Sequence, residues 1–569
     1  MRREGGGGRR EAAGGRAMKA SLRGRGNSWL IALPVIALLV WAVLYPNAAV
    51  IAGSFENGLG HWREFWASPA DHEALITSLV ISVASVFASL AIGVPLAFLL
   101  GRFEFPGRRL LRAVATLPAA LPPLVGVIAF LFLYGESGVV TRAIQRAFGM
   151  SEAPWQLRGV GAIVFVHAYT MYVYVFLFVS AGLERFDSSL DEAASGLGAN
   201  TWQRLRRVTI PLLMPAVAGS ALLVFMNALG SFSAPYVFGG GLRVLSTQIL
   251  NSKTNGAMGL AYVETTVLAL SAVLGLALFR WLDRKRKYTL ASKGGRARRA
   301  IRSRKVQLLT TIGAAVIVIA LVLPHLMVIL VSFARDGSWT TQVLPPEYTF
   351  ENYRRLFSEA ELWRPITNSV SMALIATGAN LVVCFIAAYL IVFRKFGGRR
   401  FLELLVALPW AIPATAIALG LAATFNRNDP LTGRVLLVGT FWILPLAYFI
   451  RDTPLVSSAV ESSLRQMDAS LEDAARGLGA SWLMTMRRVI IPAARPGLVA
   501  GGLLAAVAAV GEFVASVVLY THANRPISME ILAQLRALAF GTAAAYSVLL
   551  ILLVLLMTLA ARSFEERLA

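Results

Sequence analysis

The chain has 569 residues and a formal net charge of +23; 57% of its residues are hydrophobic and 15% are charged. Soluble chains hold roughly 45–50% apolar and about 25% charged residues, so this composition excludes an ordinary soluble protein. It also excludes the disordered, collagen-like and disulfide-rich classes. Cys384 is the single cysteine, which excludes an intrachain disulfide and any metal site built from several cysteines.

Twelve apolar stretches are long enough to cross about 30 Å of hydrocarbon as helices. They lie at 28–53, 75–100, 110–134, 159–183, 212–236, 257–281, 306–332, 367–393, 401–424, 435–450, 494–520 and 540–561. The tenth is the weakest, because Arg451 and Asp452 cut the apolar run short. The predicted fold class is an all-α membrane protein with about twelve transmembrane helices.

The distribution of the positive charge predicts the topology. If the chain starts in the cytoplasm and changes side at each span, 40 of the 54 Lys and Arg residues lie in cytoplasmic segments. The positive-inside rule then places both termini in the cytoplasm. In a soluble chain a charge of +23 would indicate a nucleic-acid partner. Here it reflects topology and contact with membrane lipid, so we expect no nucleic-acid partner.

The charge and the spans also predict the domain organisation. Residues 1–27 are rich in Gly and Arg and are expected to be a disordered cytoplasmic tail. The segment 283–305 is strongly basic and predicts a cytoplasmic linker between two six-helix halves, 28–282 and 306–562. Residues 563–569 form a second cytoplasmic tail.

The two halves are tandem copies in the same orientation. Residues 190–215 and 471–496 align without a gap at an offset of 281, and 13 of the 26 positions are identical. Six crossings separate the two copies, so both lie on the same side of the membrane, which the charge distribution identifies as the cytoplasm.

Each copy predicts two short helices joined by a glycine turn. The glycines break the first helix after about two turns. Asn200 or Ser481 can then cap a second short helix, which is expected to end before Pro211 or Pro492. We call these segments the first elbow (residues 190–211) and the second elbow (residues 471–492).

The elbows resemble the signature loop of permease subunits of ATP-binding-cassette (ABC) importers, which reads E-A-A-x3-G-x9-I-x-L-P. The first copy reads Glu192-Ala193-Ala194, Gly198, Val208 and Ile210-Pro211. The second reads Asp473-Ala474-Ala475, Gly479, Val489 and Ile491-Pro492. The chain therefore resembles a fused, double-length permease of a type I importer, with the fold of that family expected in each half.

The resemblance implies partners and a location. In this family the elbow docks on a cytoplasmic ATPase, which assigns ATPase coupling to Glu192, Ala193, Ala194 and Gly198, and to Asp473, Ala474, Ala475 and Gly479. It implies two copies of an ABC ATPase subunit, a periplasmic or extracellular substrate-binding protein, and a multi-pass location in the bacterial inner membrane.

The chain itself has no G-x4-G-K-[ST] phosphate loop, so it cannot hydrolyse ATP by that route. We expect no catalytic residue, metal site or cofactor in this chain. ATP and Mg²⁺ belong to the partner ATPase.

The aligned motifs Gly230-Ser231-Phe232 and Gly511-Glu512-Phe513 most resemble those of ferric-iron importer permeases. Thiamine, polyamines and 2-aminoethylphosphonate are alternative solutes within the same transporter class. A more distant alternative is a secondary transporter driven by an ion gradient, which also commonly contains repeats.

Polar residues inside the predicted spans are candidates for the translocation pathway, because burying charge in hydrocarbon is costly. Glu264 and Glu512, with Asn227 and Ser231 nearby, would favour a cationic solute. The alternative is that hydrogen bonds between helices satisfy both carboxylates and that they serve packing alone.

The fourth predicted span adds Tyr169 and Tyr172, which lie in a cluster with His167 and Tyr174. They could line the pathway or could simply lie near the membrane interface, where Tyr is common. Prolines at 118, 122, 123, 409 and 413 predict kinks in the third and ninth spans.

Overall fold

The computed structural model describes residues 28–120, 122–184, 188–284, 299–301, 303–339, 342–468 and 470–566. The predicted tail 1–27 and residues 285–298 of the predicted linker lie outside the described residues. Most of the described chain is helical, and its strands are two short parallel ones, β1 (Phe103–Glu104) and β2 (Arg299–Ala300). The predicted all-α fold class is confirmed.

The first half starts with a helix from Ser28 to Gly53, whose last part is α2 (Tyr45–Gly53). Its other helices are α3 (Gly60–Ala67), α4 (Pro69–Arg102), α5 (Arg108–Thr116), α6 (Pro123–Tyr134), α7 (Val139–Ala147), α8 (Gly159–Glu184), α9 (Ser188–Gly196), α10 (Thr201–Arg204), α11 (Ile210–Leu229), α12 (Ser233–Phe238), α13 (Leu245–Thr254) and α14 (Met258–Arg284).

The second half repeats this order, except that a short 3₁₀ turn (Pro430–Thr432) stands where the first half has α7. Its helices are α15 (Arg304–Ser332), α16 (Glu351–Ser358), α17 (Ala360–Phe393), α18 (Arg399–Ala411), α19 (Ala414–Thr424), α20 (Ile443–Arg465), α21 (Ser470–Gly477), α22 (Trp482–Thr485), α23 (Ile491–Val510), α24 (Val514–Leu519), α25 (Ile527–Arg536) and α26 (Phe540–Glu566).

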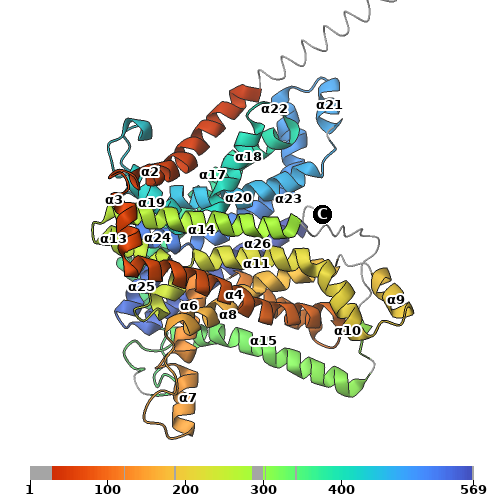
Figure 1. Ribbon diagram of the computed structural model, residues 1–569, viewed down its shortest axis with the longest axis vertical. Helices are drawn as coiled ribbons and strands as arrows, with labels where there is room; N and C mark the ends of the chain where they lie inside the picture. The colour runs from red at the N-terminus through yellow and green to blue at the C-terminus, as the bar shows by residue number, and fades with distance from the viewer. Residues whose placement is uncertain are drawn as a thin grey trace, which may run out of the picture.

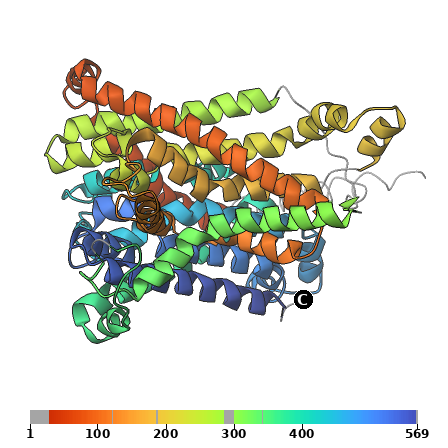
Figure 2. The same ribbon diagram turned by 90° about the horizontal axis from the view of Figure 1, so that it is seen from below.

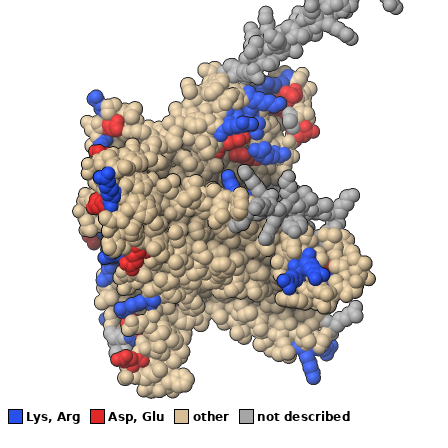
Figure 3. Space-filling view, in the orientation of Figure 1, with Lys and Arg blue, Asp and Glu red and all other residues tan. Residues whose placement is uncertain are grey.

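The membrane-crossing helices run side by side (Figures 1 and 2). Among the described residues, ten helices are long and apolar enough to cross a membrane, and α18 with α19 forms an eleventh, bent candidate. On the face drawn in Figure 3, charged side chains gather at the two ends of the helices and are sparse between them. This is the distribution expected where lipid tails surround the middle of the bundle.

The predicted proline kinks are confirmed and are larger than expected. α18 and α19 are bent by 109° where Ile412 and Pro413 separate them. In the first half, the predicted span 110–134 is wrong as a single helix: α5 ends at Thr116, a 3₁₀ turn follows, and α6 starts at Pro123. Proline lacks the N–H that would continue the helical hydrogen bonds, which explains both breaks.

The predicted tenth span is also corrected. Arg451 and Asp452 do not cut the helix short, because α20 runs through both of them to Arg465. Asp452 is buried, and Arg451 forms an ion pair with Glu512. The Arg451 charge is tolerated because Glu512, just after the end of a neighbouring helix, is its partner. A hydropathy window cannot detect such a distant partner.

The first helix of each half packs against the other half. The helix Ser28–Gly53 lies along α19 through α2: the rings of Trp41 and Phe425 are 4.9 Å apart, and the Tyr45 hydroxyl donates to Asp429 at 2.6 Å. Reciprocally, α15 packs on α5 and α6, and its residue His325 contacts Tyr169 of α8. Figure 1 shows α2 and α15 at opposite sides of the bundle. Each half therefore packs its first helix against the other half.

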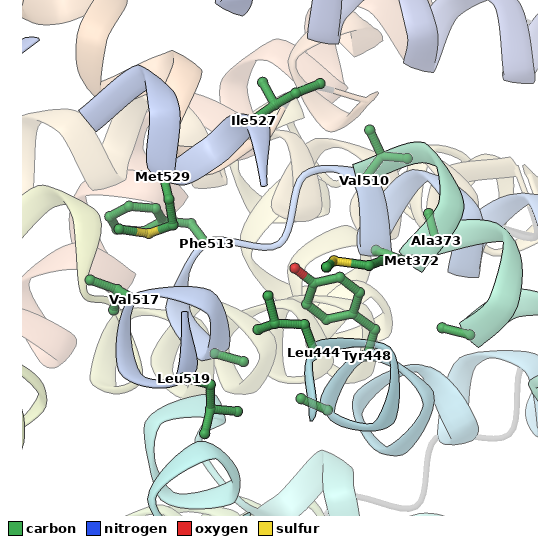
Figure 4. Packing of buried hydrophobic residues seen from close by; sticks show 14 of the residues in the cluster. Met372, Ala373, Leu444, Tyr448, Val510, Phe513, Val517, Leu519, Ile527 and Met529 are labelled. Carbon is green, nitrogen blue, oxygen red and sulfur yellow. The ribbon is translucent and has the colours of Figure 1, made fainter. Parts of the chain in front are cut away.

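The buried core is shared between the halves in the same way, because the first helix of each half contributes to the core of the other. One large apolar cluster combines most of the second half with residues of Ser28–Gly53 and α6, and another combines the first half with residues of α15. Figure 4 shows part of the former cluster, where Tyr448 of α20 lies beside Met372 and Leu444. A third, smaller cluster lies wholly within the second half, among α17, α20 and α23. The two largest clusters, however, are each shared between the halves.

A glycine at the exchanged contact provides a test of this packing. A Cβ atom at Gly420 of α19 would lie 3.0 Å from the Pro46 carbonyl oxygen, whereas one at Gly378 of α17 would meet nothing within 4 Å. We expect Gly420→Val to lower the thermal unfolding midpoint in detergent, because overpacking costs about 1–3 kcal/mol. Gly378→Val is the matched control for helix propensity, and an equal effect of the two changes would contradict the close contact.

Candidate functional site

The two elbows have the same backbone structure. α9 and α21 end at Gly196 and Gly477, and two residues later Gly198 and Gly479 adopt positive φ angles of 81° and 82°. The Ala199 N–H donates to the Ala194 carbonyl at 3.0 Å, and the equivalent bond closes the second elbow at the same distance. This is the common way in which a glycine in the left-handed conformation ends a helix, so the predicted glycine turn is confirmed.

The predicted caps of the second short helix are confirmed in both elbows. Asn200 accepts the Gln203 N–H at 2.8 Å, while the Gln203 side chain accepts the Asn200 N–H at 3.0 Å. In the second elbow Ser481 accepts the Met484 N–H at 3.3 Å. These bonds satisfy N–H groups that the first helical turn cannot pair.

The predicted end of that second short helix is wrong. A π-helical turn, Leu205–Thr209 or Met486–Ile490, follows each short helix and leads directly into α11 or α23. The wider turn before Pro211 and Pro492 accommodates the proline ring and its missing N–H. Each elbow is therefore joined rigidly to the fifth membrane helix of its half.

The residues assigned to ATPase coupling lie on the open side of each elbow. Glu192, Ala193 and Gly198 are exposed and Ala194 is half-buried, and their counterparts Asp473, Ala474, Gly479 and Ala475 repeat this pattern. Leu197 and Leu478, which precede the turn glycines, are each 90% exposed. Both elbows lie at the same end of the bundle as the end of α26 (Figures 1 and 2).

The predicted pathway residues do not form a single cluster. Ser231 meets His167, whose other ring nitrogen contacts Ser85, each at 2.9 Å. Asn227 donates to the carbonyl of Leu223 in its own helix at 2.8 Å.

The other predicted pathway residues have partners inside the bundle. Glu264 is buried and accepts a hydrogen bond from Ser252 at 2.7 Å. Tyr169 contacts His325 at 2.7 Å, and Tyr172 donates to the Ala115 carbonyl at 2.9 Å.

Breaks after α11 and α23 were missed by the predicted spans 212–236 and 494–520. The helices end at Leu229 and Val510, and Ser231 and Glu512 lie in the breaks that follow. The carbonyls of both residues accept serine hydroxyls, from Ser246 at 2.6 Å and from Ser528 at 2.7 Å. The aligned glycines were the available signal for these breaks.

The breaks bring the two halves into contact. A Cβ atom at Gly230 would lie 3.6 Å from Pro413, and one at Gly511 would lie 2.7 Å from Pro122. Each glycine thus meets the kink proline of the other half. The rings of Phe232 and Phe513 are 5.9 Å apart. In Figure 4, Phe513 lies beside Met529 and Val517.

Glu512 does not present an unpaired carboxylate. Its two oxygens lie 2.7 Å and 2.8 Å from Nη1 of Arg451, and its Oε1 also accepts the Ala515 N–H at 2.9 Å. The Arg451 side chain is 35% exposed, whereas that of Glu512 is 6% exposed. This role of Arg451 was not predicted, because its charge was taken to mark the end of a span.

The comparisons with known proteins identify the family. The profile of the family described as the binding-protein-dependent transport system inner membrane component matches residues 93–288 and again residues 380–569. The chain belongs to this family. Each match contains one elbow, so the family unit is present twice.

Full-length relatives support the same assignment. A Sinorhizobium fredii protein named as a probable ABC transporter permease, y4fN, is 30% identical over 89% of this chain and 87% of its own length. The ferric transport system permease FbpB of Actinobacillus pleuropneumoniae is 26% identical over 92% of this chain and 76% of its own length.

Shorter relatives match one part of the chain. The molybdenum transport system permease ModB of Mycobacterium tuberculosis is 30% identical over 43% of this chain and 91% of its own length. A solved bacterial ABC transporter that imports alginate is 18% identical, with a TM-score of 0.36 over 47% of this chain and 98% of its own.

The family, with the relatives y4fN and FbpB, makes the protein a permease subunit of an ABC importer and a multi-pass protein of the bacterial inner membrane. The alternative of a secondary transporter driven by an ion gradient is therefore set aside.

The ion pair of Arg451 and Glu512 can be measured by a double-mutant cycle with Arg451→Gln and Glu512→Gln. Because Glu512 is buried, we expect a coupling free energy toward the upper part of the range of about 0.5–3 kcal/mol for contacting residues. The exposed pair of Arg335 and Glu347, at 2.9 Å, is the control and is expected to give about 0.2–1 kcal/mol. Equal coupling in the two cycles, from denaturant unfolding in detergent, would contradict a buried pair.

Proposed function

We propose that this permease moves ferric iron into the cytoplasm. The support is the pair of aligned Gly-x-Phe motifs, which resemble those of ferric-iron permeases, together with FbpB relatives that cover most of the chain. A substrate-binding protein on the outer face would deliver the solute. Two copies of a separate ABC ATPase, with their ATP and Mg²⁺, would drive alternating access.

The elbows are the proposed ATPase contacts. Glu192 and Asp473 offer a carboxylate, and the neighbouring alanines and glycines allow close approach of a partner backbone. A single exposed leucine is ordinary on a protein surface. Leu197 and Leu478, however, are equally exposed at equivalent positions of both elbows, as expected if each fills an apolar hollow on an identical ATPase subunit.

The proposed orientation follows from the elbows. If they contact a cytoplasmic ATPase, the end of the bundle that carries them faces the cytoplasm. The described end of α26 lies at that same end (Figure 1), which supports a cytoplasmic C-terminus. The positive-inside rule gives the same direction.

The proposed pathway passes the contact between the halves. Ser231, Glu512 and Asn227 lie at or next to the breaks after α11 and α23, where glycine and proline from opposite halves meet. Glu264, Tyr169 and Tyr172 would support the pathway through their hydrogen bonds. The bend at Pro413 and the break at Pro122 give the helices points at which a cavity could open.

A second candidate substrate is a small oxyanion. Arg451 is more exposed than its partner Glu512, so the pair presents mainly positive charge. A guanidinium group binds oxyanions through several N–H donors. ModB, a molybdenum transport system permease, is among the relatives of this chain.

Uptake measurements distinguish the two substrates. Cells that lack this chain and then regain it, with the ATPase and binding protein present, would be given radiolabelled ferric iron or radiolabelled molybdate. We expect iron uptake to depend on the chain. Uptake of molybdate alone would replace iron by an oxyanion, and uptake of neither by an assembled complex would direct the search to thiamine, polyamines and 2-aminoethylphosphonate.

The charge of the pathway gives a second test. If iron is the solute, Glu512→Gln should weaken its uptake, because removing the carboxylate leaves the Arg451 charge uncompensated. If an oxyanion is the solute, Arg451→Gln should be the more damaging change. Initial uptake rates at several solute concentrations would measure both effects. Unaltered kinetics in both variants would show that the ion pair has a structural role only.

Obstruction of the elbows tests the coupling assignment. Gly198→Arg with Gly479→Arg should abolish transport while the protein remains in the membrane, because the new side chains project from the docking surface. Gly256→Arg with Gly439→Arg is a matched control, since both glycines also have positive φ and open surroundings. Normal solute uptake in the elbow variant would contradict the docking proposal.

A further inference from the structure

Each elbow carries two adjacent acids that face opposite ways. Asp191 is 3% exposed and Glu192 is exposed; Glu472 is 6% exposed and Asp473 is exposed. Consecutive helical residues point about 100° apart, so only one acid of each pair can face a partner. The other must be satisfied within the chain.

In the first elbow the inward acid joins two helix ends. Oδ2 of Asp191 lies 3.4 Å from Nη2 of Arg102 and 3.8 Å from Nη1 of Arg204. Arg102 is the last residue of α4, and Arg204 is the last residue of α10. All three side chains are nearly buried, with at most 11% exposed.

In the second elbow the inward acid has an equivalent set of partners. Oε1 of Glu472 contacts Nη2 of Arg394, lies 2.7 Å from Nη2 of Arg476, and accepts the Tyr389 hydroxyl at 3.1 Å. Arg394 directly follows α17, which contains Tyr389. Figure 3 shows a group of basic and acidic side chains in the region of α21 and α22.

The two sets make the same connection by different residues. α4 and α17 are the second membrane helices of their halves, and each has 34 residues. Neither α4 nor α17 is adjacent to an elbow in the sequence. The acids align at the repeat offset of 281, but the arginines do not. Both halves therefore link the elbow to the end of the second membrane helix, although the repeated segment supplies only one side of that link.

We propose that the pairs Asp191–Arg102 and Glu472–Arg394 transmit ATPase-driven movement of each elbow to α4 and α17. The elbow is continuous with α11 or α23, and the ion pair adds a second membrane helix that must follow the same movement. Coulombic attraction between largely buried charges is screened little by water. The ion pair is therefore expected to stay formed while the elbow moves. This inference rests on the proposed docking of the ATPase on the elbows.

The four residues are positioning residues, and their loss should uncouple the transporter. We expect Arg102→Gln with Arg394→Gln to lower solute uptake in vesicles at least tenfold. The ATPase subunits should still copurify and hydrolyse ATP within about twofold of the original rate, because the outward face of each elbow is unchanged. The experiment uses the full complex and the solute identified by the uptake measurements.

Two further variants keep the test specific. Arg102→Lys with Arg394→Lys preserves the charge and should retain most of the uptake, even if the glutamine variant is poorly folded. Glu461→Gln removes an exposed ion pair with Arg465 on α20, at 3.1 Å, and should leave uptake unchanged.

Solute uptake and ATPase copurification together distinguish failure of this inference from failure of the docking proposal. Unchanged uptake in the glutamine variant would overturn the inference and leave the docking proposal standing. Loss of the copurifying ATPase from that variant would also overturn it, because the arginines would then shape the docking surface rather than transmit movement. An original chain that never retains the ATPase would instead contradict the proposed function.

Discussion

The exchange of first helices is the contact on which the rest of the structure depends. Ser28–Gly53 packs in the core of the second half and α15 packs in the core of the first, so each half buries much of its apolar surface against a helix of the other. In hydrocarbon, packing rather than avoidance of water holds helices together, and close backbone approach such as that of Gly420 to Pro46 is what makes such packing favourable.

The centre of the molecule is only approximately symmetric. Gly230 meets Pro413 and Gly511 meets Pro122, so the backbones obey the repeat. The side chains beside them do not: the first half has the hydrogen-bonded pair of His167 and Ser231, whereas the second has the ion pair of Arg451 and Glu512. A transporter made of two identical chains could not hold this difference. The fused chain can therefore hold chemically unlike side chains beside equivalent backbone breaks.

Local chemistry explains which features could be predicted. The glycine turns, the Asn200 and Ser481 caps and the proline kinks depend on residues within one turn of each other, and the structure confirms all of them. The length of α20 and the role of Arg451 depend on Glu512, which lies 61 residues away, so hydropathy alone placed a helix end where there is none. The inward acids of the elbows were missed for the same reason, since their arginine partners lie outside the repeated segment.

The exchange also has a consequence for biosynthesis. Tyr45 and its partner Asp429 are separated by 384 residues. At a synthesis rate of about 5–20 residues per second, the first helix enters the membrane about 20–80 s before α19 exists to receive it. During that interval its future contact face lies against lipid or against a temporary neighbour. The order in which the ribosome delivers the helices thus obliges the nascent first half to remain open, and assembly of the importer is completed from the C-terminal side.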